Sequence, residues 1–277
     1  MSVFKIMNKH IKQMIKSSLV ALDPKTAIQL SAARARRHAQ MLEISWGLVE
    51  ETHRYASKYG NTVCCGPFSG MMYSPGSLDR HVTDKLMGTY EMELHSFLEE
   101  AIKAGPERVI DVGSAEGYYA VGLARRLPDA TVFAFDADSW ARERTAQMGA
   151  VNGSTNLKTL GLCTEQWLVD NVGDKTLVIM DCEGCEAGLT AFVPLWRSHL
   201  LSWWLIELHE TQAPGVTHTL LQRFNQTHHT ELVTSRSRNR EDLPDFLKSE
   251  MNLPVLKWMD EHRDPGQQWL LCRPKTA

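Results

Sequence analysis

The sequence predicts an α/β fold, in which a mostly parallel sheet of seven strands carries helices on both faces. Two observations support this. Short apolar runs alternate with helical stretches after Pro106, and a turn containing two glycines follows the first run. The runs expected to form strands are residues 108–112, 131–135, 157–162, 176–180, 203–208, 231–234 and 268–272. The helical segments between the first five are residues 117–127, 139–149, 165–169 and 187–196.

The composition is that of a globular protein, with 43% hydrophobic and 23% charged residues among 277. A net charge of −3 gives no indication of general affinity for nucleic acid. The longest apolar stretch, residues 200–208, is far too short for a membrane span, and six cysteines are too few for a disulfide-built scaffold. We therefore expect a soluble cytoplasmic protein, with no signal peptide, no transmembrane segment and no nucleic-acid partner.

The first 60 residues are predicted to form a helical extension. In residues 1–22, apolar side chains and lysines alternate at helical spacing, as in a basic amphipathic helix. Such a helix can dock on the protein's own core, lie on an anionic membrane surface, or pack on a partner helix.

A second apolar stripe follows Asp23-Pro24, which is a typical helix start, and Gly60 offers its end. Its members are Ile28, Ala32, Ala35, Ala39, Leu42, Trp46, Val49, His53 and Ala56. We expect one long helix over residues 24–60, because Gly47 weakens a helix only slightly. A stripe of this length usually packs on another helix, which is either the first helix folded back on it or a helix of a second subunit. A homodimer through the N-terminal helices is therefore a hypothesis.

Three strand ends are expected to form the site, because ligands of parallel sheets bind beyond the carboxyl ends of the strands. After the first strand, Gly113 and Gly117 allow a sharp turn and a close approach to a ligand. The run from Asp111 is Asp-x-Gly-x-x-x-Gly, which lacks the third glycine of a dinucleotide fingerprint. Asp136 ends the second strand, where an acid suits the two ribose hydroxyls of a nucleoside.

The fourth and fifth strands end in acidic residues and a histidine. Asp181, Glu183 and Glu186 follow the fourth strand, and Glu207 and His209 share one face of the fifth. Asp181, Glu207 and His209 can hold a divalent metal that lowers the pKa of an acceptor hydroxyl. Alternatively, His209 can act directly as a general base that a carboxylate orients. The third interpretation is structural: carboxylates at a helix start and a core histidine.

Residues 109–117, Val-Ile-Asp-Val-Gly-Ser-Ala-Glu-Gly, with Asp136 downstream, resemble class I methyltransferases that use S-adenosylmethionine. Within that class, residues 180–186, Met-Asp-Cys-Glu-Gly-Cys-Glu, are similar to the Asp-x-Glu-Gly-x-Glu run of FkbM-like methyltransferases. Residues 66–71 and 86–91 resemble stretches upstream in some of those proteins. The resemblance implies a Rossmann-like, seven-stranded sheet whose last strand is antiparallel. It also implies methyl transfer, commonly to a hydroxyl of a natural product or sugar.

The resemblance also assigns residues to roles. The expected contacts of the cofactor S-adenosylmethionine are Asp111, Gly113, Ser114, Glu116, Gly117, Asp136 and Cys163. Asp111 would lie near the methionine amine or order the loop, Asp136 would hold the ribose, and Cys163 would lie beside the adenine. Residues 61–84 form a loop rich in Gly, Pro and Ser, and such long loops are commonly functional. As a cover for the cleft, this region would offer acceptor contacts from Tyr73, His81, Lys85 and Tyr90.

Together these observations divide the chain into a helical extension (1–60), a lid with its helix over 90–103 (61–105), and a cofactor-binding methyltransferase domain (106–277). The expected substrate is a hydroxyl of a small molecule or glycan. The alternatives are a non-catalytic binding or assembly protein on the same fold, or a methyltransferase acting on a protein or nucleic acid.

Two paired motifs are given structural interpretations. Cys182 and Cys185 have the spacing of a metal or redox pair, but no second pair lies at ligand spacing. We interpret them as small residues packed near a helix start. His228-His229 is interpreted as part of a loop.

Overall fold

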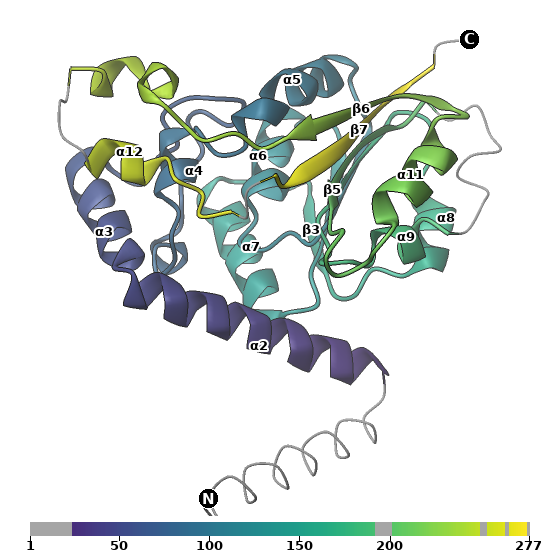
Figure 1. The fold of residues 1–277 in the computed structure, drawn as a ribbon, viewed down its shortest axis with the longest axis horizontal. Coiled ribbons are helices and arrows are strands. Elements are labelled where there is room, and N and C mark those ends of the chain that lie inside the picture. Colours follow the sequence, from purple (N-terminus) through teal and green to yellow (C-terminus); the bar gives the residue numbers. More distant parts are fainter. Residues whose placement is uncertain (1–23, 192–200, 250–253, 264–265, 276–277) are drawn as a thin grey trace, which may run out of the picture.

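The computed structural model describes residues 24–191, 201–249, 254–263 and 266–275, and its seven strands form one sheet (Figure 1). These are β1 (Arg108–Val112), β2 (Thr131–Phe135), β3 (Leu157–Leu160), β4 (Thr176–Met180), β5 (Trp203–Leu208), β6 (His228–Thr234) and β7 (Gln268–Pro274). Their order is β3-β2-β1-β4-β5-β7-β6; β1 to β5 are parallel, and β7 is antiparallel to both neighbours. The predicted fold class, a mostly parallel sheet of seven strands whose last strand in the chain is antiparallel, is confirmed.

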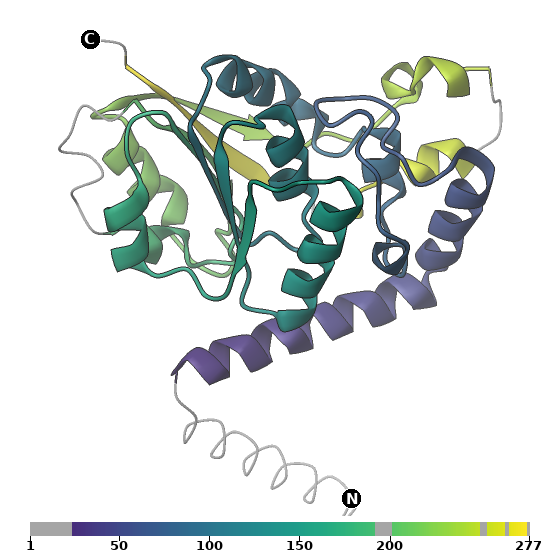
Figure 2. The ribbon, with the colours of Figure 1, turned by 180° about the vertical axis from the view of Figure 1, so that it is seen from behind.

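Helices cover both faces of the sheet (Figures 1 and 2). One face carries α5 (His95–Lys103), α6 (Tyr118–Arg126) and α7 (Ser139–Val151), and the other carries α8 (Glu165–Asn171), α9 (Glu186–Leu189) and α11 (Val216–Phe224). All five residues of β4 are buried, as expected for a central strand with helices on both sides. Its side chains alternate between two hydrophobic cores, with Leu177 and Ile179 in one and Val178 and Met180 in the other.

The N-terminal region consists of two helices, so the prediction of one long helix over residues 24–60 is wrong. α2 (Pro24–Ser45) ends before Gly47, which adopts a left-handed backbone with φ of +73°, and α3 (Leu48–Tyr59) then turns away (Figure 1). α2 lies along α7, where Arg36 pairs with Asp138 at 2.5 Å. The predicted end at Gly60 is confirmed. The basic helix expected before residue 23 lies outside the described residues.

The segment between α3 and β1 contains η1 (Pro75–Ser77), α4 (Thr83–Met87) and η2 (Met92–Leu94), followed by α5. The helix predicted over 90–103 starts later, at His95, because Glu91 has a left-handed backbone with φ of +47°. Although the segment is irregular, its apolar side chains are buried in the same core as α5 and α6. These include Val63, Phe68, Met71, Tyr73, Leu86 and Met87. The segment is therefore part of the body of the domain.

The C-terminal part runs from β6 through η3 (Arg240–Asp242), η4 (Asp245–Leu247) and α12 (Pro254–Trp258) to β7. The prediction of a loop at His228-His229 is wrong, because both residues belong to β6. The His228 ring is buried and hydrogen bonds with the Ser202 carbonyl at 3.0 Å. Within the described ranges, every helix falls short of the length or apolar character needed to cross a membrane.

Candidate active site at the carboxyl ends of the strands

The strand order reverses between β1 and β4, and the loops that follow these two strands are in direct contact. Gly113 has φ of +95°, and a Cβ atom there would lie 1.6 Å from the carbonyl oxygen of Asp181. The Asp181 N–H donates to the Val112 carbonyl at 2.8 Å. Open α/β sheets bind ligands at such reversals, so the glycine turn and the acidic loop meet where a ligand is expected.

The glycine turn is held from both sides. Gly113 and Ser114 donate their N–H groups to the Phe135 carbonyl at 2.8 and 3.0 Å. Gly117, with φ of +99°, lets α6 begin close to α7, since a Cβ atom there would lie 3.1 Å from the Thr145 Cα. The Ser114 hydroxyl lies 3.5 Å from that of Thr145. The turn is thus fixed to β2 and α7.

Asp136 lies beside this turn, as predicted from the spacing. Its carboxylate accepts hydrogen bonds from the Ala115 N–H at 3.0 Å and from the Asp138 N–H at 2.8 Å. Burial raises the pKa of Asp136 from 3.8 to about 6, although these two hydrogen bonds oppose the shift. An acceptor carboxylate therefore lies directly against the loop after β1.

Asp111 is buried in β1, and its Oδ2 atom has no hydrogen-bond partner. Burial, with the nearby charges of Asp181 and Asp136, raises the pKa of Asp111 from 3.8 to about 8. A buried carboxyl oxygen without a partner is costly, so a ligand that binds Oδ2 would remove that cost. A cationic group such as an ammonium suits it best, because a positive charge would stabilise the ionised carboxylate.

We expect Asp111 to make the protein less stable as the pH rises. The folded protein keeps this proton up to about pH 8, whereas the unfolded chain releases it near pH 3.8. Between these values the folded state binds more protons, so the free energy of unfolding falls by at most about 1.4 kcal/mol per pH unit. The uncharged variant Asp111→Asn should show a shallower fall, as thermal unfolding at about pH 5.5 and about pH 7.5 would reveal. The exposed Asp129→Asn should behave like the wild type, and an unchanged slope in Asp111→Asn would contradict the assignment.

Two other predicted cofactor contacts, Glu116 and Cys163, are buried. Glu116 accepts from Lys85 Nζ at 2.5 Å and from the Tyr73 hydroxyl at 3.3 Å. Burial disfavours its ionised form, but the Lys85 charge outweighs that cost and lowers its pKa. Cys163, between β3 and α8, is also buried, and this raises the pKa of its thiol to about 12. Lys85 and Tyr73, predicted as acceptor contacts, thus bind Glu116.

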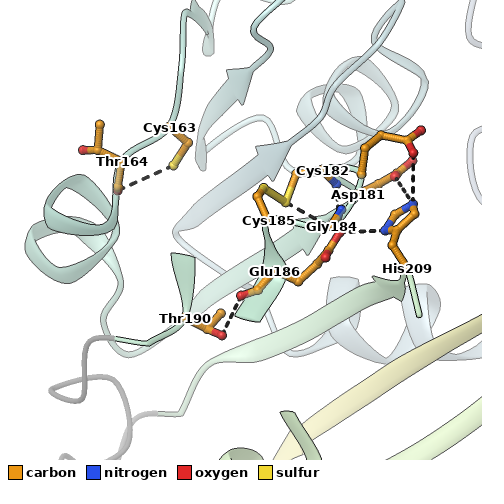
Figure 3. Close-up of a disulfide and its surroundings, with 10 residues drawn as sticks. Cys163, Thr164, Asp181, Cys182, Gly184, Cys185, Glu186, Thr190 and His209 are labelled. Atoms are coloured by element: carbon orange, nitrogen blue, oxygen red, sulfur yellow. Dashed lines mark hydrogen bonds and ion pairs between the residues drawn. A yellow bond between two sulfur atoms is a disulfide. The ribbon is translucent and has the colours of Figure 1, made fainter. Parts of the chain in front are cut away.

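His209 follows β5 and points into the loop after β4 (Figure 3). Its Nδ1 atom lies 2.7 Å from Glu186 Oε1, and its Nε2 atom lies 3.5 Å from Asp181 Oδ1. The hydrogen bond to Glu186 and the charge of Asp181 outweigh the effect of burial and raise the pKa of His209 above 6.5. One ring nitrogen is therefore held by a buried carboxylate, and the other faces the strand ends.

Glu207 lies next to this pair but is bound to an arginine. Arg263 Nη1 donates to Glu207 Oε1 at 2.9 Å, and Nη2 donates to the Tyr90 hydroxyl at 2.5 Å and to Glu91. Burial and the charge of Asp181 raise the pKa of Glu207 to about 10, although Arg263 opposes the shift. Burial and Asp181 thus disfavour the ionised form of Glu207, whereas Arg263 favours it.

The structure brings most of the predicted site residues to one edge of the sheet. Asp181, Glu207 and His209 each offer a ligand atom within 4.8 Å of the others. His81 lies elsewhere: it hydrogen bonds to the Asp260 carbonyl at 2.9 Å and lines a separate cavity of about 620 Å³ beside α3. Sequence reasoning missed Arg263, for which no motif gave a signal. It named Glu186 in the acidic cluster but did not identify it as the partner of His209.

Cys182 and Cys185 form a disulfide at the start of α9 (Figure 3). Our interpretation of them as merely small packed residues is therefore wrong. The spacing allowed a redox pair, but the bond depends on the turn formed by Glu183 and Gly184, both with positive φ. That turn was not visible in the sequence.

No protein-family profile and no curated protein sequence matches the chain. Similar solved structures include the O-methyltransferase TomG from Streptomyces achromogenes in complex with SAM, at 11% identity and a TM-score of 0.44, covering 87% of this chain and 98% of that one. An rRNA methylase from Streptococcus thermophilus has 15% identity and a TM-score of 0.45, with coverages of 67% and 99%. Precorrin-6y C5,15-methyltransferase from Geobacter metallireducens has 8% identity and a TM-score of 0.45, with coverages of 66% and 89%. Values this low say nothing about this chain's activity or substrate.

Proposed function

We propose that the protein is an S-adenosylmethionine-dependent methyltransferase that methylates a hydroxyl of a small molecule or glycan. The observation that carries this proposal is the contact between two loops at the strand-order reversal. One is the glycine turn flanked by Asp111 and Asp136, and the other positions the Glu186–His209 pair. A nucleoside-binding turn and a base beside it are what a methyl transfer to a hydroxyl requires.

The residues present fit the cofactor. The carboxylate of Asp136 would accept hydrogen bonds from the ribose hydroxyls, and Asp111, whose Oδ2 has no partner, would bind the methionine ammonium. The methionine and ribose parts of the ligand would lie against Gly113, Ser114 and Gly117, and the adenine would lie near Cys163. When bound, S-adenosylmethionine supplies a methyl group on a positively charged sulfur.

The protein's own contribution is to hold the acceptor and remove its proton. With Nδ1–H donated to Glu186, the Nε2 atom of His209 has a free lone pair that can accept the proton of an acceptor hydroxyl. Glu186 and Asp181 then stabilise the imidazolium that forms. The remaining catalytic effect comes from excluding water and aligning the acceptor, because displacement at a methyl group depends on an in-line geometry.

Calorimetric titration with S-adenosylmethionine tests the cofactor assignment. Asp136→Ala should weaken binding by at least about tenfold, because two hydrogen bonds to a charged group are lost. The exposed Asp129→Ala serves as the matched control and should bind like the wild type. No binding by the wild type at millimolar ligand would overturn the proposal.

A metal-assisted reaction is the second candidate, favoured by the closeness of Asp181, Glu207 and His209. Glu186 behind His209 also matches the carboxylate that commonly orients a metal-bound histidine. However, Arg263 Nη1 donates to Glu207 Oε1 at 2.9 Å, so an arginine occupies this oxygen in the present arrangement. The donor set thus fits a cation only if Arg263 moves, and direct base catalysis is the simpler scheme.

Chelation separates the two schemes. We expect S-adenosylhomocysteine release, assayed with an acceptor found by screening sugars and phenols, to survive EDTA unchanged. Under the metal scheme, EDTA should abolish release and added Mg²⁺ or Mn²⁺ should restore it. Glu207→Gln should likewise be far more damaging if Glu207 is a ligand than if it only contacts Arg263.

For the acceptor we propose that residues 61–105 form one wall of its site. Tyr90 has the strongest case, because Arg263 joins its hydroxyl to Glu207 at the strand end. Tyr73 and Lys85 would act through Glu116, and His81 would contribute least, since it lies on the separate cavity. Dimerisation through α2 is a further part of the proposal, since Met41 on α2 and Trp46 directly after it are exposed.

A further inference from the structure

The disulfide between Cys182 and Cys185 lies within the loop that positions the general base. The disulfide closes a covalent ring over residues 182–185, the disulfide ring. Asp181 directly precedes this ring and Glu186 directly follows it, and both contact His209 (Figure 3). Both cysteines are partly exposed, so a small thiol can reach them.

The disulfide ring also positions the carboxylate of Glu186, which hydrogen bonds with His209. Glu186 Oε1 accepts the N–H of Gly184 at 3.1 Å and that of Cys182 at 3.4 Å, in addition to the bond with His209. These N–H groups face one oxygen because Glu183 and Gly184 have φ of +58° and +101°. A covalent link across four residues maintains this turn.

The ring also adjoins the cofactor side. Asp181 donates to the Val112 carbonyl, and its own carbonyl lies against Gly113. A change in the backbone of residues 181–186 therefore acts on the turn after β1 as well as on His209.

We infer that Cys182 and Cys185 are a reversible thiol–disulfide modification site that controls the candidate active site; this inference rests on the proposed function. A thiolate of an external dithiol attacks one sulfur, the S–S bond breaks, and the other sulfur leaves with the electron pair. The second thiol of the reagent resolves the mixed disulfide. In sum, two electrons and two protons pass to the cysteines and the dithiol becomes a cyclic disulfide.

Reduction weakens the site in two ways. The covalent constraint on Glu183 and Gly184 is lost. The new Cys182 thiol, whose sulfur lies 3.6 Å from Glu186 Oε1, also becomes a donor that competes with His209 for that oxygen. The oxidised protein is therefore the competent form.

The test uses the full chain with and without dithiothreitol. Thiols are counted by iodoacetamide labelling and mass spectrometry, amide exchange is measured over residues 181–186, and S-adenosylmethionine binding is measured by calorimetry. Reduction should expose two further thiols, raise amide exchange in this segment and weaken binding by about tenfold, and re-oxidation should reverse all three changes. Cys182→Ser/Cys185→Ser should match the reduced wild type, while Cys64→Ser/Cys65→Ser should still respond to dithiothreitol.

Two results would overturn the inference: free thiols at both positions in the oxidised protein, or a disulfide whose reduction changes neither amide exchange nor binding. If the double serine variant fails to fold, the reversible titration of the wild type decides alone. If neither redox form binds S-adenosylmethionine, the proposed function fails. The exchange data then still decide whether the pair controls the loop.

Discussion

Replacing His209 with alanine is expected to lower kcat by about 10²- to 10⁴-fold, the usual contribution of a general base. The cofactor should still bind with nearly wild-type affinity, because the ring contacts Asp181 and Glu186, whereas the proposed cofactor contacts are Asp111 and Asp136. The measurement is S-adenosylhomocysteine release, together with calorimetry of S-adenosylmethionine binding. His218→Ala, an exposed histidine on α11, is the control.

The pH profile gives an independent readout of the same assignment. A base must be deprotonated, so kcat should fall as the pH drops through the pKa of His209. That pKa lies above 6.5, and Glu186→Gln should therefore move the acid limb to lower pH. A His209→Ala variant with wild-type kcat would rule out His209 as the general base, whatever the pH profile of kcat.

The second large effect is expected for Gly113→Ala. The added Cβ atom would lie 1.6 Å from the Asp181 carbonyl oxygen, and the backbone has φ of +95°, which L side chains rarely adopt. The carbonyl oxygen belongs to the backbone and the backbone fixes the position of the Cβ atom, so a side-chain rotation cannot relieve the clash. We expect the free energy of unfolding to fall by about 3 kcal/mol or more and S-adenosylmethionine binding to be lost.

Thermal unfolding and calorimetry measure the two consequences separately. Gly161→Ala is the matched control, because it follows β3 and has no atom within 4 Å of an added Cβ. It should change stability by less than about 1 kcal/mol. Wild-type stability and binding in Gly113→Ala would show that the two loops do not meet as described.

Much of the sheet could be predicted because its signals are local. Each strand is a short apolar run, and turns at Gly113 and Gly117 mark where the first strand meets a helix. Parallel strand ends share one edge, so Asp136, Asp181 and His209 could be placed together before any coordinates were known.

The errors concern features that tertiary contacts decide. A glycine such as Gly47 costs a helix only about 1 kcal/mol, so it does not by itself predict a break. The chain bends there because α2 packs on α7 while α3 packs on α4. Likewise, Arg263 reaches Glu207 only because the chain returns from α12 to β7 over the strand ends. Neither the bend at Gly47 nor the contact of Arg263 with Glu207 follows from a spacing or a motif in the sequence.

The burial of Val63, Phe68, Met71 and Tyr73 in the core shared with α6 limits how the protein can diversify. In many enzymes a substrate loop is a detachable module that can be exchanged between relatives while the scaffold stays intact. Here Phe68 fills the space above Gly122, so the helix and the segment must vary together. A chimera that transplants residues 61–105 alone would replace part of the core, and new acceptor preferences would require paired changes in α6.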